Sequence, residues 1–235
     1  MSLKKMKSPL NPILQGIFLI CAILIPSTSS ARSNSPQTPS TGKVSTISSE
    51  WTIPYDGDGS ISFDSQDGIV MQPATSTSPY ETHAALALSN LTKAHPMKDF
   101  QLMIRASTEE QLRTPAPNAW EVFTIFFNYD VDNSGKKNTN YLKLTDNGVE
   151  LGTLSDKNGQ TFLATSKGQM LSLGKINTYL LIKKGNHIDI SIDGEPIINF
   201  TDTSSPHQFY DVAGSIGLYT EDARVRIHSV EILPL

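Results

Sequence analysis

The feature that most restricts the fold is a two-residue alternation of apolar and polar side chains. Residues 187–193 read HIDISID, so that Ile188, Ile190 and Ile192 all fall on one side. Residues 100–104, FQLMI, alternate in the same way. A period of two is that of a β-strand, because successive side chains point to opposite faces. The chain is therefore expected to fold mainly into strands that each bury one face.

Short turn signals separate these strands, namely Asn147-Gly148, Asn158-Gly159, Gly185-Asn186 and Asp193-Gly194. Each pair supplies the positive φ that a tight hairpin requires. They predict a hairpin over residues 141–153 and a three-stranded meander over residues 180–200. About a dozen short strands with such turns predict an all-β sandwich of two sheets, or a jelly roll.

Two segments are harder to interpret. Residues 122–129, VFTIFFNY, are apolar on both faces. This predicts a central strand covered on both sides, but it leaves open which side chains face the core. Residues 108–113 are the best helix candidate, one or two turns that end before Pro115 and Pro117.

The N-terminus has the pattern of a signal peptide. Lys4, Lys5 and Lys7 precede an apolar run over residues 13–25, and small residues follow it up to Ala31. The run is short for a transmembrane helix. We therefore expect residues 1–31 to be a cleaved signal and the protein to be secreted, periplasmic or held at the cell surface. An uncleaved N-terminal anchor is the alternative, and would be the only membrane contact.

Removal of the signal changes the composition of the chain. The remaining residues carry 16 basic against 23 acidic side chains, a formal charge of −7, and no cysteine. Stability must then come from a large core rather than from disulfides. The acidic balance argues against nucleic acid as a partner.

Residues 32–49 are rich in Ser, Thr and Pro and predict a flexible linker. This leaves residues 50–235 as one β-sandwich domain.

Three blocks of the sequence carry a resemblance to a known superfamily. They are NAWEVFTIFFNYDVDNSGKKNTNYLKLTDNGVELGTLSDKNGQTFLAT (118–165), NTYLLIKKGNHIDISIDGEPIINFTD (177–202) and GSIGLYTEDARVRIHSVEIL (214–233). This pattern resembles the concanavalin A-like lectin/glucanase superfamily, and within it the laminin-G-like and 3-keto-disaccharide hydrolase-like domains. The resemblance implies a jelly-roll β-sandwich of two antiparallel sheets. It does not imply one activity, because the fold carries lectins, hydrolases and lyases.

Catalytic and metal-binding motifs give little support to an enzyme. The glucanases of this superfamily carry E-x-D-x-x-E on one strand, and the chain has no such run. The alginate-lyase motifs are also missing. Asp130, Asp132 and Ser134 match the start of a calcium loop, but Tyr141 stands where the bidentate Glu is needed. The sequence therefore predicts no metal site and no cofactor, with a structural calcium ion as the one alternative.

A sugar-binding surface is the remaining candidate site. Sugar sites combine an aromatic ring with planar polar groups. In the predicted hairpin Leu142 and Leu144 point inward, which leaves Tyr141 and Lys143 on the other face. The candidate glycan platform consists of Arg105, Trp120, Glu121, Asn128, Tyr141 and Lys143. The alternative is that Trp120 and Tyr141 are core or hairpin-edge aromatics and that Lys143 is a solvated residue on the surface.

Three functions remain open at this point. The first is a lectin-like module that binds a glycan or polysaccharide without chemistry, and it fits the missing motifs best. The second is a glycoside hydrolase or polysaccharide lyase of the 3-keto-disaccharide hydrolase-like type. A cleft that holds two carboxyls, or one carboxyl of raised pKa, would favour it. The third is a laminin-G-like envelope domain that binds proteins, which would show a large apolar patch.

Overall fold

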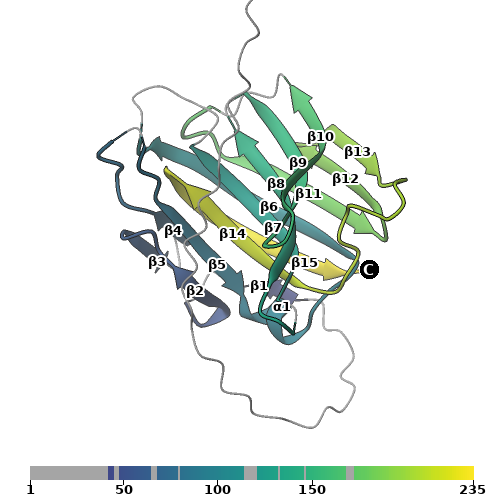
Figure 1. Ribbon diagram of the computed structural model, residues 1–235. Coiled ribbons are helices and arrows are strands. Elements are labelled where there is room, and N and C mark those ends of the chain that lie inside the picture. Colours follow the sequence, from purple (N-terminus) through teal and green to yellow (C-terminus); the bar gives the residue numbers. More distant parts are fainter. Residues whose placement is uncertain are drawn as a thin grey trace, which may run out of the picture. The chain divides into compact units, whose positions relative to one another are not determined.

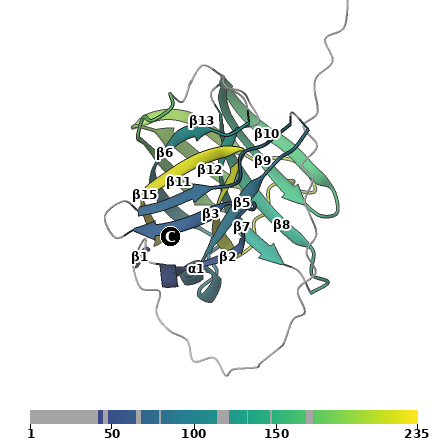
Figure 2. The same cartoon turned by 90° about the vertical axis from the view of Figure 1, so that its left-hand side faces the viewer.

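The computed structural model describes residues 42–44, 48–64, 68–78, 80–113, 121–131, 133–145, 147–167 and 172–235. The predicted signal, residues 1–31, lies outside the described residues. The described strands form two antiparallel sheets packed face to face (Figure 1). Figure 2 separates the two layers. The expected all-β jelly-roll sandwich is thus confirmed.

The two sheets are named A and B. In order across the sheet, sheet A consists of β13 (Glu195–Thr201), β12 (His187–Ile192), β11 (Asn177–Lys184), β6 (Phe100–Gln111), β15 (Ala223–Pro234), β4 (Gly68–Gln72) and β3 (Ser60–Asp64), with β1 (Gly42–Val44) also paired to β15. Sheet B consists of β10 (Gly159–Lys167), β9 (Gly148–Ser155), β8 (Lys137–Thr145), β7 (Val122–Val131), β14 (Ser215–Glu221), β5 (Ala84–Ser89) and β2 (Trp51–Tyr55).

The core lies between the sheets and is filled by the alternating apolar residues. Phe100, Leu102 and Ile104 of β6 are fully buried, as the alternation predicted. Sheet B contributes Phe127, which meets Phe100 edge-on with 5.8 Å between the ring centroids. Edge-to-face rings are a favoured aromatic geometry. The predicted hairpin and meander appear as β8–β9 and β11–β12–β13.

The turn residues adopt the conformations for which they were identified. Gly159, Gly185 and Gly194 all have positive φ, and so does Asp193. Positive φ is strained for most side chains but open to glycine. These residues therefore fix the ends of the hairpins on which the strand register depends.

The prediction of a helix over residues 108–113 is wrong. Strand β6 continues to Gln111, and its last residues pair with β15. Glu109 forms cross-strand ion pairs with Arg224, at 3.0 Å, and with Arg226. Local helix propensity is overridden here by pairing with a strand more than 100 residues away.

Three short elements were not expected, one of them the single-turn 3-10 helix Ser48–Glu50. The helix α1 (Asn90–Ala94) begins after Ser89, whose hydroxyl accepts a hydrogen bond from the Thr92 amide at 3.3 Å. Such a side chain is a favoured N-cap.

Strand β1 lies inside residues 32–49, the segment predicted as a linker. Its residues 42–44 pair with Val230 to Ile232 of β15. None of the described helices is long and apolar enough to cross a membrane.

A buried lysine fastens the segment between β13 and β14 to sheet A. Lys183 is fully buried, and its ammonium donates to the Lys98 carbonyl at 2.8 Å and to Asp211 at 2.9 Å. Asp99 lies at 3.4 Å from the same nitrogen. A buried charge is tolerated only when it is paired in this way.

Candidate functional site

The outer face of sheet B is the surface on which polar and aromatic side chains gather. In β7, Phe123, Ile125 and Phe127 face the core, so Thr124 and Phe126 point to the outer face. This settles the side assignment that the sequence left open. Across the sheet Thr124 pairs with Tyr219 on one side and with Lys143 on the other. We call this surface the outer face.

A tyrosine and a glutamate of β14 form the chemically unusual part of the outer face. The Tyr219 hydroxyl donates a hydrogen bond of 2.8 Å to Oε2 of Glu221. Burial, together with the negative charge of Asp222, raises the pKa of Glu221 to about 7. Burial also raises the pKa of Tyr219 well above its usual value. Near neutral pH the carboxyl can therefore both give and accept a proton.

Two positively charged side chains counteract the effect of burial on Glu221. Lys143 and Arg113 each lower its pKa. Arg113 itself forms an ion pair with the fully buried Asp222, with 3.0 Å between Nη1 and Oδ2. Asp222 also accepts from the Ser76 hydroxyl at 2.8 Å and from the His83 amide at 2.9 Å. This network holds the chain next to Glu221 in place.

A second polar cluster lies on β8, β9 and β10 of the same face. Glu150 is its centre, because three donors reach its carboxylate. Lys143 lies 3.1 Å from Oε2, the Tyr141 hydroxyl donates to Oε1 at 2.6 Å, and Gln160 donates to Oε1 at 3.1 Å. Gln160 also donates to the Tyr141 oxygen at 2.6 Å. Charged and planar polar groups arranged this way are suited to the hydroxyls of a sugar.

Thr124 lies between the two clusters with an unused hydroxyl. Its side chain is 2% exposed, and its Oγ1 has no hydrogen-bond partner among the described residues. A buried hydroxyl without a partner costs about 1–3 kcal/mol. In the strand register this hydroxyl lies between Tyr219 of β14 and Lys143 of β8.

The structure brings together only part of the platform predicted from the sequence. Tyr141 and Lys143 do lie side by side on the outer face of sheet B. Arg105 is exposed, but on β6 of sheet A, so it belongs to the other sheet and cannot join them. Trp120 lies outside the described residues.

The other two predicted residues have structural partners. Glu121 is 3% exposed and accepts a hydrogen bond of 2.8 Å from the Arg113 amide. Asn128 is fully buried with a positive φ of 50°, and its amide donates to the carbonyls of Met97 and Val212. It ties loops to the irregular end of β7, which a surface role in sugar binding does not fit.

Sequence reasoning missed Tyr219 and Glu221, the hydrogen-bonded pair on the outer face whose pKa values are raised by burial. They stand in the segment GSIGLYTEDARVRIHSVEIL, which was used only to recognise the fold. The alternation of Gly217, Tyr219 and Glu221 could have placed all three on one face of a strand. It could not have placed that strand beside β7, which lies about 90 residues earlier in the chain.

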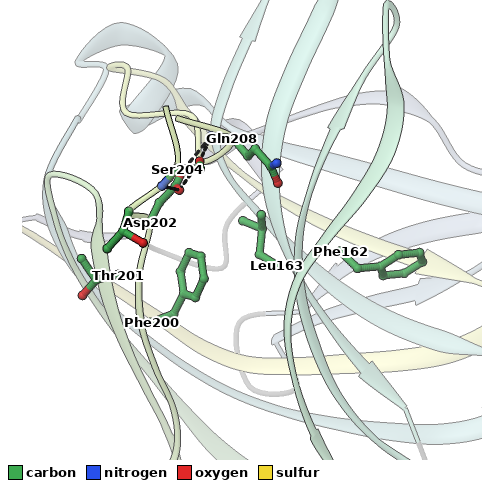
Figure 3. A pocket seen from close by; sticks show the side chains of 8 residues that line it. Phe162, Leu163, Phe200, Thr201, Asp202, Ser204 and Gln208 are labelled. Carbon is green, nitrogen blue, oxygen red and sulfur yellow. Dashed lines mark hydrogen bonds between the residues drawn. The ribbon is translucent and has the colours of Figure 1, made fainter. Parts of the chain in front are cut away.

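A pocket of about 210 Å³ opens elsewhere, between β10 and the end of β13 (Figure 3). Its one acidic side chain, Asp202, accepts hydrogen bonds from the amides of Ser204, Gln208 and Phe209. Although burial acts in the opposite direction, these hydrogen bonds hold the pKa of Asp202 at about 2. Because this carboxylate is already occupied in shaping a loop, the pocket lacks a group for acid–base chemistry.

The described residues contain no cluster of three His, Cys, Asp or Glu side chains placed to hold a metal ion. Of the residues that match the start of a calcium loop, Asp132 lies outside the described residues. The expected absence of a metal site and its alternative, a structural calcium ion, both stay untested.

Comparisons with known proteins agree with this architecture. Residues 42–233 match the sequence model of the 3-keto-alpha-glucoside-1,2-lyase-like domain. No curated protein matches the sequence.

Among solved structures, a β-glucanase from Bacillus licheniformis is similar with a TM-score of 0.58 and 12% identity over 85% of this chain and 100% of its own. A carbohydrate-binding module, CBM66 from Bacillus subtilis, is similar with a TM-score of 0.54 and 15% identity over 78% of this chain and 94% of its own. At such identities these structures establish the shared fold alone.

Proposed function

The chain belongs to the 3-keto-alpha-glucoside-1,2-lyase-like domain family, and we propose that it binds a glycoside on the outer face of sheet B and cleaves it there. The observation that carries this proposal is Glu221, a carboxyl with a pKa of about 7 that lies beside Tyr219. A carboxyl of raised pKa is one part of the feature expected to favour an enzyme over a lectin-like module, the other part being a cleft around it.

The family description implies an elimination across C1 and C2 of a sugar that carries a ketone at C3. The ketone acidifies the C2 hydrogen, because the negative charge left behind spreads onto the ketone oxygen. In the proposed reaction the Glu221 carboxylate accepts this proton, and the C–H electron pair becomes the C1–C2 double bond. The C1–O bond breaks, and the departing oxygen takes up the proton now held by Glu221 and leaves as an alcohol, which returns Glu221 to the carboxylate form. The reaction consumes no oxidant or reductant.

The neighbours of Glu221 suit this task. A base works best when its pKa lies near the working pH, and the pKa of Glu221 does. The Tyr219 hydrogen bond to Oε2 fixes the orientation of the carboxylate. Lys143 adds a positive charge on the same face, and the unpaired Thr124 hydroxyl is a further group for the ketone oxygen or a ring hydroxyl.

Sugar binding without chemistry is the second candidate function. It is favoured by the Glu150 cluster, whose donors and acceptors suit hydroxyl recognition. The fold shared with the CBM66 module adds support. Binding and cleavage would use the same face, so one experiment separates them.

That experiment incubates the full chain with methyl 3-keto-α-glucoside and follows the release of methanol and the absorbance of the unsaturated ketone. Wild-type protein should release both products in equal amounts. Glu221→Gln should still bind the sugar but lose at least about a hundredfold in rate, the usual contribution of a general base. Equal rates in the variant and the wild type would overturn the assignment of Glu221.

The matched control is Glu195→Gln, an identical change at an exposed glutamate on sheet A. It should leave the rate unchanged. If the wild type bound the sugar without releasing product, the lectin-like function would replace the lyase. If it bound no sugar at all, a protein-binding role of the laminin-G-like type would be favoured.

We also propose that the chain is exported. The lysines and apolar run within residues 1–31 support a signal that is cleaved after Ala31. Intact-mass measurement of the protein from its native host should give the mass of residues 32–235. A mass that includes residues 1–31 would indicate an uncleaved anchor instead.

A further inference from the structure

Phe162 is an exposed aromatic side chain on the outer face of sheet B. It lies on β10, the edge strand, and is 61% exposed. Its partner across the strands is Gly152 of β9, over which the Tyr141 side chain lies. Phe162 and Tyr141 therefore project from the same face of the sheet. In Figure 3 the side chains of Phe162 and Leu163 leave β10 in different directions, and both residues line the pocket.

Phe162 and Leu163 leave β10 on opposite faces, as neighbouring strand residues do, and a bulge follows directly after Phe162. The pairing with β9 shifts register between Phe162 and Ala164, so that Leu163 has no partner. Leu163 packs against the core, whereas Phe162 keeps its place beside Gly152. Bulges of this kind re-aim side chains and are common next to functional sites.

A single exposed apolar side chain needs no explanation by itself. What distinguishes Phe162 is its position beside polar groups that suit a sugar. Gln160, two residues earlier on the strand, bonds Tyr141 and Glu150. An aromatic ring bordered by planar polar side chains can stack on the apolar face of a pyranose while the polar groups bind its hydroxyls.

The distance across the sheet determines how long the ligand must be. Thr124 lies on β7 and Phe162 on β10, which are separated by β8 and β9. Three strand spacings of about 4.8 Å make this separation at least about 14 Å along the sheet. One sugar ring cannot touch both residues.

We propose that the ligand is a glycan of two or more rings, with its reacting ring beside Glu221 and Thr124 and a more distant ring stacked on Phe162. This inference rests on the proposed function, since it assigns a second subsite to the same face. The second ring is held by Phe162 together with the cluster of Gln160, Tyr141 and Glu150. Phe162 is then a specificity residue that selects chain length.

The test compares ligands of one, two and three rings, each with a 3-keto group on its terminal unit: methyl 3-keto-α-glucoside, 3-keto-maltose and 3-keto-maltotriose. Calorimetry is done on the full chain carrying Glu221→Gln, so that turnover does not consume them. Affinity should rise with length, and adding Phe162→Ala should remove that gain, about tenfold. It should leave the affinity for the one-ring ligand unchanged.

Two further variants keep the outcome specific. Phe162→Tyr preserves the ring and should keep the gain with length. Leu173→Ala removes an exposed side chain before β11 and should also keep it. Affinity that does not rise with length, or a gain that survives Phe162→Ala, would overturn the second subsite while the one-ring site stands. Failure of all three ligands to bind would overturn the proposed function itself.

Discussion

The side chain of Tyr141 lies across the α-carbon of Gly152 on the neighbouring strand, where a Cβ would overlap the phenol. The absence of a side chain at residue 152 thus lets the Tyr141 hydroxyl reach Glu150 and Gln160. One glycine determines the geometry of the whole cluster.

Gly152→Ala should lower the free energy of unfolding by about 1–3 kcal/mol, because the new methyl also meets the fixed Thr161 carbonyl. The matched control is Gly217→Ala on β14. There the new Cβ would approach only side-chain atoms, the nearest 3.0 Å away on Leu88, which can shift. Denaturant unfolding should show the smaller loss for Gly217→Ala. Equal losses would contradict the assigned role of Gly152.

Glu221→Gln should change how stability depends on pH. The pKa of Glu221 in the folded chain is about 7, above its ordinary value of 4.5. The folded state therefore binds this proton more tightly, and its contribution to stability is present below pH 4.5 and lost as the pH rises through 7.

Glutamine carries no such charge, so the variant should gain stability relative to the wild type over that range. The gain should reach up to about 3 kcal/mol. Thermal unfolding of both proteins from pH 4 to pH 8 measures it. A constant difference in melting temperature across the range would mean that the carboxyl titrates normally.

Tyr219→Phe should shift the pH dependence of cleavage upward. The Tyr219 hydrogen bond lowers the pKa of Glu221, against the larger effect of burial. Without it the base form appears only at higher pH, so the rising limb of kcat/KM moves above pH 7. Tyr141→Phe is the control, because that hydroxyl bonds Glu150 instead. Its midpoint should stay near 7, and a shift as large as that of Tyr219→Phe would argue against a direct effect.

Lys183→Met should be among the most destabilising changes to a charged residue. It removes the donor of the buried Lys98 carbonyl and one of the two lysine partners of Asp211, which keeps its ion pair with the Lys98 ammonium at 2.9 Å, so the cost should be about 1–3 kcal/mol. Lys184→Met, at the exposed neighbouring residue, should cost less than about 0.5 kcal/mol. Urea unfolding of the two variants makes the comparison. A small loss for Lys183→Met would show that methionine packing replaces the ionic contacts.

Much of the fold could be predicted from the sequence, because each strand carries its own alternation. Ile188, Ile190 and Ile192 identified β12 and its buried face without reference to any other strand. The glycine turns then linked neighbouring strands into hairpins. The prediction failed at residues 108–113, where the strand depends on the distant partner β15.

The site was less predictable because it also depends on strands that are distant in the sequence. Tyr141 and Lys143 could be placed on one face because a single hairpin contains both. Arg105 was grouped with them although its strand, β6, belongs to sheet A, because no local signal tells which of two sheets a strand joins. Glu221 draws its raised pKa from burial and from its neighbours on the folded sheet, and the sequence does not reveal burial of a carboxyl.

The position of the last two strands has a consequence for the order in which this protein can mature. Strand β14 lies between β7 and β5, and β15 lies between β6 and β4, so both sheets have an interior gap until residues 215–234 have been made. Sheets closed by such distant pairings form slowly. The outer face of sheet B, with Tyr219 and Glu221, therefore cannot be completed until almost the whole chain has been made.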